Sequence, residues 1–409
     1  MKSKKGFMTI SKMENKNKSF FEKITLNFII FLYKFLNFFL DSFRFLLFGR
    51  LKIPKNIKKI VIFRTGNIGD IICSVPAMAT IRKNFPKAEI ILLSSPGKKG
   101  GLGAKELLEK TEFLDGLINY YQEDIKNFKD KIGLIRRLRR EKFDLFIELP
   151  QDLARLRTLI RNIIFAKSIK ARYSFGFQVN TIRLFKQIQA RYLRFSNEVE
   201  RLLEILKKEN LKIDNISFPL AISEEDERIV REFLDSFGNR NFIAINPNAK
   251  REINLWPLER FAEVGRHLID NYNLKILITG GKNDKERTER LKKMIGQGAT
   301  SIAGKFTILQ TIELLKNSQL LISNDTGAIH MAVAAERPVV GIYSARWFKY
   351  KWEPYGQKNI VLKKEPKCHA CFLEKCEHLT CLKMISVEEI WKEAEQVLNQ
   401  NLDKNNYDK

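Results

Sequence analysis

Short apolar runs alternate with amphipathic stretches along most of this chain. Between residues 57 and 220 the apolar runs have the length and composition of buried strands: Ile60–Phe63, Glu89–Leu93, Leu117–Asn119, Leu145–Leu149 and a shorter run near Ser174–Phe177. The stretches between them carry apolar residues at helical spacing, which predicts helices over 75–84, 104–111, 124–141, 153–166 and 196–208. Strands that alternate with helices in this way predict a parallel sheet with helices on both faces.

The same pattern starts again after a polar break near residues 209–223. A helix is expected over 223–237, and strands then alternate with helices; the strands are 242–246, 275–279, 299–302, 319–323 and 339–343, and the helices are 257–271, 284–295, 308–316 and 327–335. A last helix is expected over 386–399, and residues 400–409 have the composition of a disordered tail. The 409 residues therefore predict two domains, each large enough to bury its own core.

The first 60 residues differ from the rest in charge and aromatic content. They hold fourteen Lys and Arg against three acidic residues, and Phe28–Phe48 would just span a bilayer if Lys34, Asp41 and Arg44 did not interrupt it. On a helix these three charges fall broadly on one side, so we expect an amphipathic helix that lies in the membrane interface. The alternatives are a transmembrane anchor and a helix that simply packs on the domain. A secretory signal peptide is not expected, because no small-residue cleavage site follows.

The net charge of +26 indicates attraction to anions, which include nucleic acids, lipid headgroups and phosphorylated glycans. A second basic stretch runs from Arg136 to Arg172 and is typical of either a solvated helix face or a surface that meets an anionic substrate. Aromatic-interleaved nucleic-acid motifs are absent from the sequence, so a nucleic-acid partner is not expected.

Two of the expected strands end in turns that suit an anionic ligand. The first reads Arg64-Thr65-Gly66-Asn67-Ile68-Gly69-Asp70 and leads into an apolar helix, which Pro76 is expected to kink or to make irregular in its first turn. The turn places Asp70 near a helix N-terminus at the carboxyl end of a parallel strand, where open α/β sheets bind their ligands. A carboxylate there can accept a proton from a substrate hydroxyl, or it can merely cap the helix.

The second turn lies within Ser323–His330, between an apolar strand and a helix of small residues. Backbone N–H groups at Thr326 and Gly327, together with the helix dipole, suit a diphosphate, and His330 adds a donor on the first helical turn. Asp325 is expected to hold the turn or a sugar hydroxyl, because its charge would repel phosphate. An ordinary strand–helix turn with a structural histidine is the alternative interpretation.

Several motifs, in order along the chain, resemble glycosyltransferase family 9, which contains the ADP-heptose:lipopolysaccharide heptosyltransferases. They are 58–70 with 74–77 and 81–86, then 142–145, 246–249, 256–257 with 261–262, 279–281 with Asp284, 304–305, and 324–327 with His330. The resemblance covers roughly residues 57–390. It implies an α/β protein of the GT-B fold, in which two Rossmann-like domains face each other across a cleft, here preceded by an N-terminal amphipathic helix.

The expected domain division follows from this resemblance. A basic, Phe-rich, membrane-associating segment (1–56) precedes an acceptor domain (57–220), a nucleotide-sugar domain that carries a cysteine cluster (221–385), and a C-terminal helix with its tail (386–409).

The resemblance implies an inverting transfer of heptose from ADP-heptose to a lipopolysaccharide core acceptor of the lipid A–Kdo type, with no cofactor required. Asp70 takes the role of the base, and Gly66, Asn67 and Gly69 shape the turn on the acceptor side. Donor contacts are expected from Asp325, Thr326, Gly327, His330, Lys305, Gly280, Gly281, Lys250 and Arg251. The implied partners are the nucleotide sugar, an anionic glycolipid and, through the N-terminal helix, the cytoplasmic face of a bacterial inner membrane.

Asn254 departs from the family pattern, because many members carry a basic residue two positions before the Trp-Pro pair. Lys250 or Arg251 could replace it. Two rival functions remain: a family 9 enzyme that uses another nucleotide sugar to build O-antigen or capsule glycan, and a non-catalytic, membrane-bound scaffold that keeps a degenerate sugar-nucleotide fold. The intact Asp70 and Asp-Thr-Gly turn disfavour the scaffold.

Four of the five cysteines form a compact cluster, Cys368-x2-Cys371-x4-Cys376-x4-Cys381, with His369 and His378 among them. In a protein without an export signal, zinc is the usual occupant of such a cluster, so a structural zinc site is one interpretation. Free thiols, an iron–sulfur cluster and disulfides are the alternatives. Cys73 sits apart on an apolar helix and is expected in the core.

Overall fold

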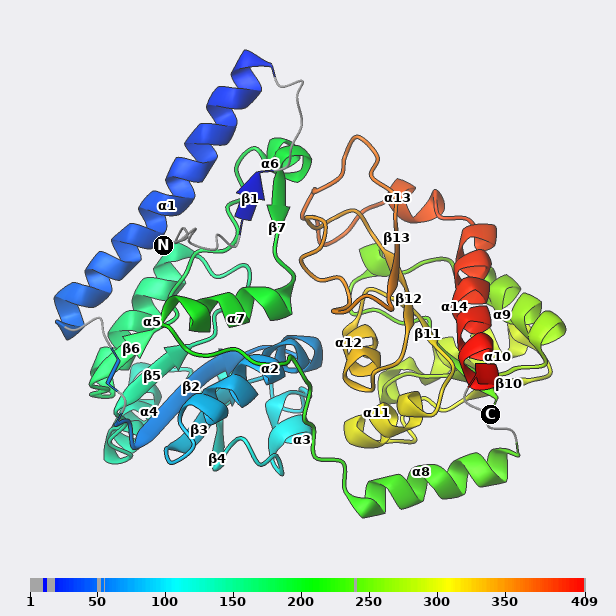
Figure 1. Ribbon diagram of the computed structural model, residues 1–409, viewed down its shortest axis with the longest axis horizontal. Coiled ribbons are helices and arrows are strands. Elements are labelled where there is room, and N and C mark those ends of the chain that lie inside the picture. The colour runs from blue at the N-terminus through cyan, green and yellow to red at the C-terminus, as the bar shows by residue number, and fades with distance from the viewer. Residues whose placement is uncertain (1–9, 13–18, 50–52, 55, 239–240, 408–409) are drawn as a thin grey trace. The chain divides into compact units, whose positions relative to one another are not determined.

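The structure is a computed structural model that describes residues 10–12, 19–49, 53–54, 56–238 and 241–407. The chain forms two compact units. The first comprises residues 1–221 together with 349–351, and the second comprises 222–348 and 352–409. Each unit contains its own parallel sheet with flanking helices, which confirms the expected α/β class (Figure 1).

The first unit is built on a five-stranded parallel sheet of strand order β4-β3-β2-β5-β6. Its strands are β2 (Lys59–Thr65), β3 (Glu89–Ser95), β4 (Gly116–Asn119), β5 (Leu145–Glu148) and β6 (Tyr173–Phe175). The apolar residues of these strands are almost fully buried, because helices cover the sheet. The strand order reverses between β2 and β5, and such a switch point is where open α/β sheets bind ligands.

The helices of the first unit largely follow the predicted amphipathic stretches. They are α2 (Ile68–Asn84), α3 (Ala104–Leu108), α4 (Phe128–Arg140), α5 (Leu156–Ser168), α6 (Lys186–Tyr192) and α7 (Glu198–Lys208). α2 begins earlier than predicted, at Ile68, and continues through Pro76 as one helix. Neither α6 nor the antiparallel pair of β1 (Ile10–Lys12) with β7 (Leu193–Phe195) was predicted from the sequence. Elements as short as these strands carry almost no periodic signal.

The Phe-rich segment forms one long helix, α1 (Phe20–Phe48), which starts at a capping box of Ser19 and Glu22. It packs on α5, α6 and β6 (Figure 1). The polar side of α1 faces the protein in part: Arg44 is buried and donates to the Ser174 carbonyl at 2.6 Å, and the Asn37 amide oxygen accepts from the Val179 N–H. The helix therefore packs on the domain and is amphipathic at the same time.

The second unit is built on a six-stranded parallel sheet of order β10-β9-β8-β11-β12-β13. Its strands are β8 (Phe242–Asn246), β9 (Lys275–Ile278), β10 (Ala299–Ser301), β11 (Leu321–Asn324), β12 (Val339–Tyr343) and β13 (Ile360–Lys363), the last of which was not predicted. The strand order reverses between β8 and β11. The turn after Asn324 therefore lies at the switch point of this sheet, as the turn after β2 does in the first.

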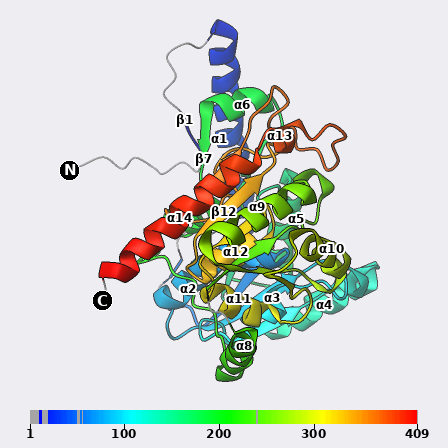
Figure 2. The same ribbon diagram turned by 90° about the vertical axis from the view of Figure 1, so that its right-hand side faces the viewer.

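The helices of the second unit are α8 (Glu224–Phe237), α9 (Leu258–Tyr272), α10 (Lys285–Ile295), α11 (Ile308–Lys316), α12 (Gly327–Ala334), α13 (Thr380–Lys383) and α14 (Val387–Tyr407). α14 packs on α9 (Figure 2) and shares a core with the fully buried Trp256, whose indole N–H donates to the Ile385 carbonyl at 3.2 Å. The expectation that residues 400–409 form a disordered tail is wrong as far as Tyr407, because α14 extends to that residue. Residues 408–409 lie outside the described part.

Candidate active site

The turn between β2 and α2 fixes the position of Asp70. Gly66 adopts a φ of 143°, and a Cβ atom there would lie 2.5 Å from the Asp70 Cβ, so this position requires glycine. Asn67 is the N-cap of α2, and its backbone N–H donates to Asp70 Oδ2 at 3.0 Å. Asp70 therefore caps its own helix, as the alternative interpretation supposed. Its side chain nevertheless remains partly exposed, at 20%.

A buried guanidinium supports the turn from beneath. Arg64, the sixth residue of β2, is fully buried and donates from its Nη2 to the Asp70 carbonyl oxygen at 2.9 Å. Its Nη1 donates to the carbonyls of Leu149 and Pro150, which follow β5. The Asp70 Oδ1 lies 3.8 Å from the same guanidinium. Arg64 thus joins the carboxyl ends of the two strands at the switch point and places a positive charge behind the Asp70 carboxylate.

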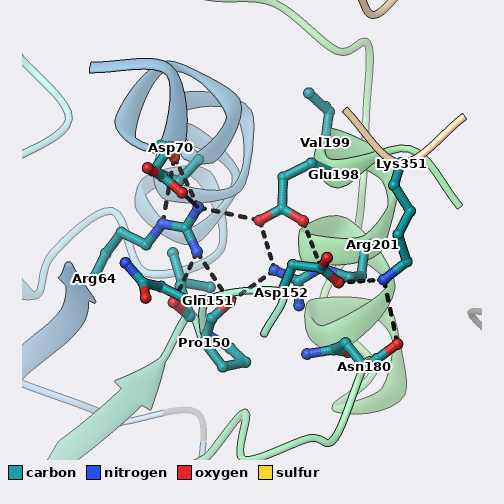
Figure 3. Close-up of polar contacts among 12 residues, drawn as sticks. Arg64, Asp70, Pro150, Gln151, Asp152, Asn180, Glu198, Val199, Arg201 and Lys351 are labelled. Carbon is teal, nitrogen blue, oxygen red and sulfur yellow. Dashed lines mark hydrogen bonds and ion pairs between the residues drawn. The ribbon is translucent and has the colours of Figure 1, made fainter. Parts of the chain in front are cut away.

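The charge on Arg64 is balanced by Glu198, the first residue of α7 (Figure 3). The two side chains pair at 3.1 Å, and Arg201 binds both oxygens of Glu198, at 2.6 and 2.7 Å. All three side chains are almost fully buried. A buried ionic group is tolerated only when it is paired and hydrogen-bonded, and each member of this group meets that condition.

The network extends to a segment that is remote in sequence. Residues 349–351 belong to the first unit, and Lys351 forms a buried ion pair with Asp152 (Figure 3). The Lys351 carbonyl also accepts from the Glu198 N–H at 2.9 Å, at the start of α7. Burial raises the pKa of Asp152, but the cationic Lys351 and Arg201 outweigh it and hold this pKa below its usual value.

In the second unit, the predicted donor turn follows β11. Thr326 is the N-cap of α12, and Gly327 begins the helix, so their backbone N–H groups stand at a helix N-terminus. His330 is buried, 7% exposed, and its ring lies edge-on to the ring of Trp352. Burial raises the pKa of Asp325 to about 6, against the lowering effect of nearby cationic side chains.

Asn254 has a structural role that explains its departure from the family pattern. Its amide nitrogen donates to Asp325 Oδ2 at 3.0 Å, and its amide oxygen accepts from the Ser344 hydroxyl at 2.7 Å. Asn254 therefore orients the Asp325 carboxylate. Of the two proposed substitutes for a basic residue, Lys250 is exposed, whereas Arg251 pairs with Glu374.

The loops after β9 and β10 lie together. A Cβ atom on Gly280 would lie 2.8 Å from the Asn248 amide nitrogen, and Gly281 donates its N–H to Asp284 Oδ2 at 2.8 Å. The Gly304 N–H donates to the Gly280 carbonyl at 2.9 Å, which places the exposed Lys305 beside this turn. The structure thus brings together 248, 280–281 and 304–305 at the carboxyl end of the second sheet.

No role was predicted from the sequence for Arg64, Asp152, Glu198, Arg201, Lys351 or Glu374. One signal was available, since Arg64 and Glu148 are charged residues that end apolar strands, and such groups are buried only with partners. Nothing in the sequence identified those partners.

All four clustered cysteines and His378 line one small cavity in the second unit, whereas Cys73 is buried on α2, as expected.

Comparison with known proteins places this geometry in a family. The family model for glycosyltransferase family 9 (heptosyltransferase) matches residues 132–381. The chain belongs to glycosyltransferase family 9. It is therefore a glycosyltransferase, and its two parallel sheets are those of the GT-B class.

Family 9 proteins with similar sequence and fold are found in several bacteria. The lipopolysaccharide core heptosyltransferase OpsX of Haemophilus influenzae is 23% identical over 293 residues, which are 70% of this chain and 79% of that protein. A family 9 structure from Veillonella parvula has a TM-score of 0.70 at 22% identity and covers 86% of this chain and 100% of its own. The ADP-heptose lipopolysaccharide heptosyltransferase II of E. coli has a TM-score of 0.60 at 19% identity, with 84% and 99% covered.

Proposed function

We propose that this family 9 enzyme transfers heptose from ADP-heptose to a lipopolysaccharide core acceptor of the lipid A–Kdo type, with inversion at the anomeric carbon. The position of Asp70 carries the proposal. A partly exposed carboxylate stands at the switch point of the first sheet, and a backbone N–H and a buried guanidinium fix its orientation. The names of the heptosyltransferase relatives support the choice of heptose and of ADP-heptose.

In the proposed reaction, Asp70 is the base. One carboxylate oxygen takes the proton from the acceptor hydroxyl while the hydroxyl oxygen attacks the anomeric carbon. The bond between that carbon and the diphosphate oxygen breaks in the same step, and ADP leaves with the bonding electrons. A single displacement inverts the anomeric centre and requires no metal or other cofactor.

The departing diphosphate is stabilised by the second unit. The N–H groups of Thr326 and Gly327 at the start of α12 face the developing negative charge, and the exposed Lys305 and Lys250 add cations. Gly280 and Gly281, in the loop after β9, border the nucleotide. Asp325 holds a sugar hydroxyl, and Asn254 keeps its carboxylate in place.

An amphiphilic acceptor requires the enzyme to work at a membrane surface, and α1 supplies the contact. Ten large apolar side chains of α1 are exposed: Phe20, Phe21, Ile24, Phe28, Phe31, Phe35, Phe38, Phe39, Phe45 and Leu46. At 100° per residue, they occupy about a third of the helix circumference, opposite the face that packs on the domain. Among the described helices, α1 is also the one with the length and composition to cross a membrane.

We propose that α1 lies flat in the cytoplasmic leaflet of the inner membrane. Its packed face is held by specific polar contacts: the Tyr33 hydroxyl donates to Gln189 and accepts from the Ile182 N–H, and Arg44 reaches Ser174. A transmembrane orientation would break all of these contacts. Exposed Phe rings buried at the headgroup boundary and nearby cations facing anionic lipid are typical of an interfacial helix.

The decisive experiment measures binding and transfer separately. Calorimetry of purified protein against ADP-heptose and against UDP- and GDP-sugars is compared between wild type, Asp70→Asn and a control, Asp130→Asn. We expect selective ADP-heptose binding in all three, and transfer to a core acceptor reduced by roughly 10²- to 10⁴-fold only in Asp70→Asn. Preference for another nucleotide sugar would refute the substrate assignment, and absence of any binding would favour the scaffold.

The membrane proposal has its own test. Flotation with vesicles that contain anionic lipid compares wild type with a variant in which Phe31, Phe35 and Phe38 are replaced by serine. We expect the wild type to float and the variant to stay in solution with unchanged nucleotide affinity. Resistance of the wild type to extraction by high salt and alkaline carbonate together would instead support a transmembrane anchor.

A further inference from the structure

The cysteine cluster lies in a loop of the second unit between β13 and α14. Cys368, Cys371, Cys376 and Cys381 line a single cavity together with His378. The cavity volume of about 20 Å³ leaves room for one atom or ion. The four sulfur atoms are the main potential ligands in this cavity, because most of its other lining side chains are apolar: Ile253, Ala345 and Leu373.

The backbone of the loop is held so that the cysteines face this cavity. The Ala370 N–H donates to the Ala345 carbonyl at 2.7 Å, and the Phe372 N–H donates to the Arg346 carbonyl at 3.1 Å. Ala370 and Phe372, on either side of Cys371, have φ values of 52° and 58°. A left-handed conformation is strained for a non-glycine residue, so other interactions must stabilise this loop.

Hydrogen-bond donors lie around the sulfur atoms of this cavity. Arg346 lines the cavity and is 1% exposed, and its Nη1 has no hydrogen-bond partner among the described residues. The backbone N–H groups of Ala345 and Leu382 point to the Cys381 sulfur. The His378 Nε2 lies 3.5 Å from the Cys376 sulfur. A buried donor without a partner is costly, and an anionic metal–thiolate centre would satisfy it.

We propose that Cys368, Cys371, Cys376 and Cys381 bind one divalent transition-metal ion, Zn²⁺ or Fe²⁺, as four thiolate ligands. His378 then donates a hydrogen bond to the Cys376 sulfur, and Arg346 faces the net negative charge of the centre. Among the described residues, no three such side chains already converge at ligand distance, so the partly exposed cysteines turn inward when the metal binds. The metal bonds offset the strain of the loop.

This centre also has a consequence for the donor turn. Glu374, in the middle of the cysteine loop, forms ion pairs with both Arg251 and Arg346. These two guanidinium groups in turn act on the Asp325 carboxylate and lower its pKa against the effect of burial. The metal would therefore fix two cations beside the proposed donor site. This consequence rests on the proposed function, whereas metal binding itself does not.

The test measures the metal content of the full chain, purified with reductant and without chelator. We expect about one zinc or iron per chain in the wild type, and elemental analysis distinguishes the two metals. Cys371→Ser and Cys376→Ser should lose the ion, and the control Cys73→Ala should retain it. Substitution with Co²⁺ should give the absorption bands of a tetrahedral thiolate site.

A thiol-specific mercurial titration covers the case in which the cysteine variants do not fold. In folded wild type, modification of four thiols should release one metal ion in parallel. Three results would overturn the proposal. The protein could stay metal-free after incubation with Zn²⁺ and Fe²⁺, the cysteine variants could hold as much metal as the wild type, or the cluster could contain two disulfides. Loss of metal with unchanged ADP affinity would refute only the effect on the donor turn.

Discussion

The guanidinium of Arg64 lies 3.1 Å from a carboxylate oxygen of Glu198, and both side chains are almost fully buried. This ion pair joins the carboxyl end of β2 to the first residue of α7, across 134 positions of sequence. Arg64 also donates to the Asp70 carbonyl, so α7 is coupled to the residue proposed as the base. Glu198 is therefore a positioning residue in the proposed mechanism.

Substitution Glu198→Gln should reduce kcat with little change in the KM for the nucleotide sugar. The unbalanced charge of Arg64 would stabilise the Asp70 carboxylate, so the acidic limb of the pH–rate profile should move to lower pH. Loss of the buried partner should also destabilise the first unit by about 3–5 kcal/mol. Steady-state kinetics across pH and thermal melts check both effects, and Glu204→Gln on the same helix is the control. An unshifted pH profile would leave Glu198 with a structural role alone.

Gly66→Ala should impair both stability and transfer. The added Cβ would meet Asp70 at 2.5 Å, and the φ of 143° is unfavourable for alanine. The matched control is Gly133→Ala in α4, where a Cβ has open space; it should stabilise the protein by about 0.5–1 kcal/mol. Chemical denaturation and transfer assays compare the two variants. If the two variants have equal stability and equal transfer activity, the close contact between residue 66 and Asp70 is contradicted.

The affinity for ADP should depend on the charge of Asp325. Its pKa of about 6 means that the carboxyl is largely neutral at pH 5 and ionised at pH 7.5. Ionisation would repel the diphosphate, so ADP binding to the wild type should weaken over this range relative to Asp325→Asn, by up to about tenfold. Calorimetry at several pH values measures the difference, in which the titration of ADP itself cancels. Parallel pH curves would exclude the effect.

Glu148 should lower the stability of the first unit at alkaline pH. Burial raises its pKa to about 8, from 4.5 in the unfolded chain, against the lowering effect of the hydrogen bond from Asn162. Below pH 4.5 both states are protonated. As the pH rises from 4.5 to 8 only the unfolded state ionises, so stability falls, and the loss levels off above about pH 8.

Glu148→Gln removes this dependence, so its stability advantage over the wild type should grow through that range. Thermal melts from pH 4.5 to 9 measure the difference. Glu112→Gln, at an exposed glutamate of the same unit, is the control. If the wild type is as stable relative to Glu148→Gln at pH 8 as it is at pH 4.5, the Glu148 carboxyl is ionised in the folded state.

Local sequence accounts for much of the fold and for the two turns of the candidate site. The apolar runs that end at Phe63 and at Ile322 predicted buried strands, and both strands formed with the expected turns after them. Boundaries were predicted less well: α2 begins at Ile68, where the Asp70 carboxylate accepts from the Asn67 N–H, a local interaction that includes the proposed base. The role of Asn254 was missed because its partner, Asp325, is 71 positions away.

By itself, the sequence determined which segments are strands and helices, where the glycine turns fall, and which family the motifs resemble, because periodicity and turn chemistry act over a few residues. Only the tertiary structure decided which buried charges pair, that residues 349–351 join the first unit, and which face of α1 stays exposed. These features depend on segments far apart in the chain. Hydrophobic periodicity shows that a face is buried, but the partner it meets is selected by packing of the whole unit.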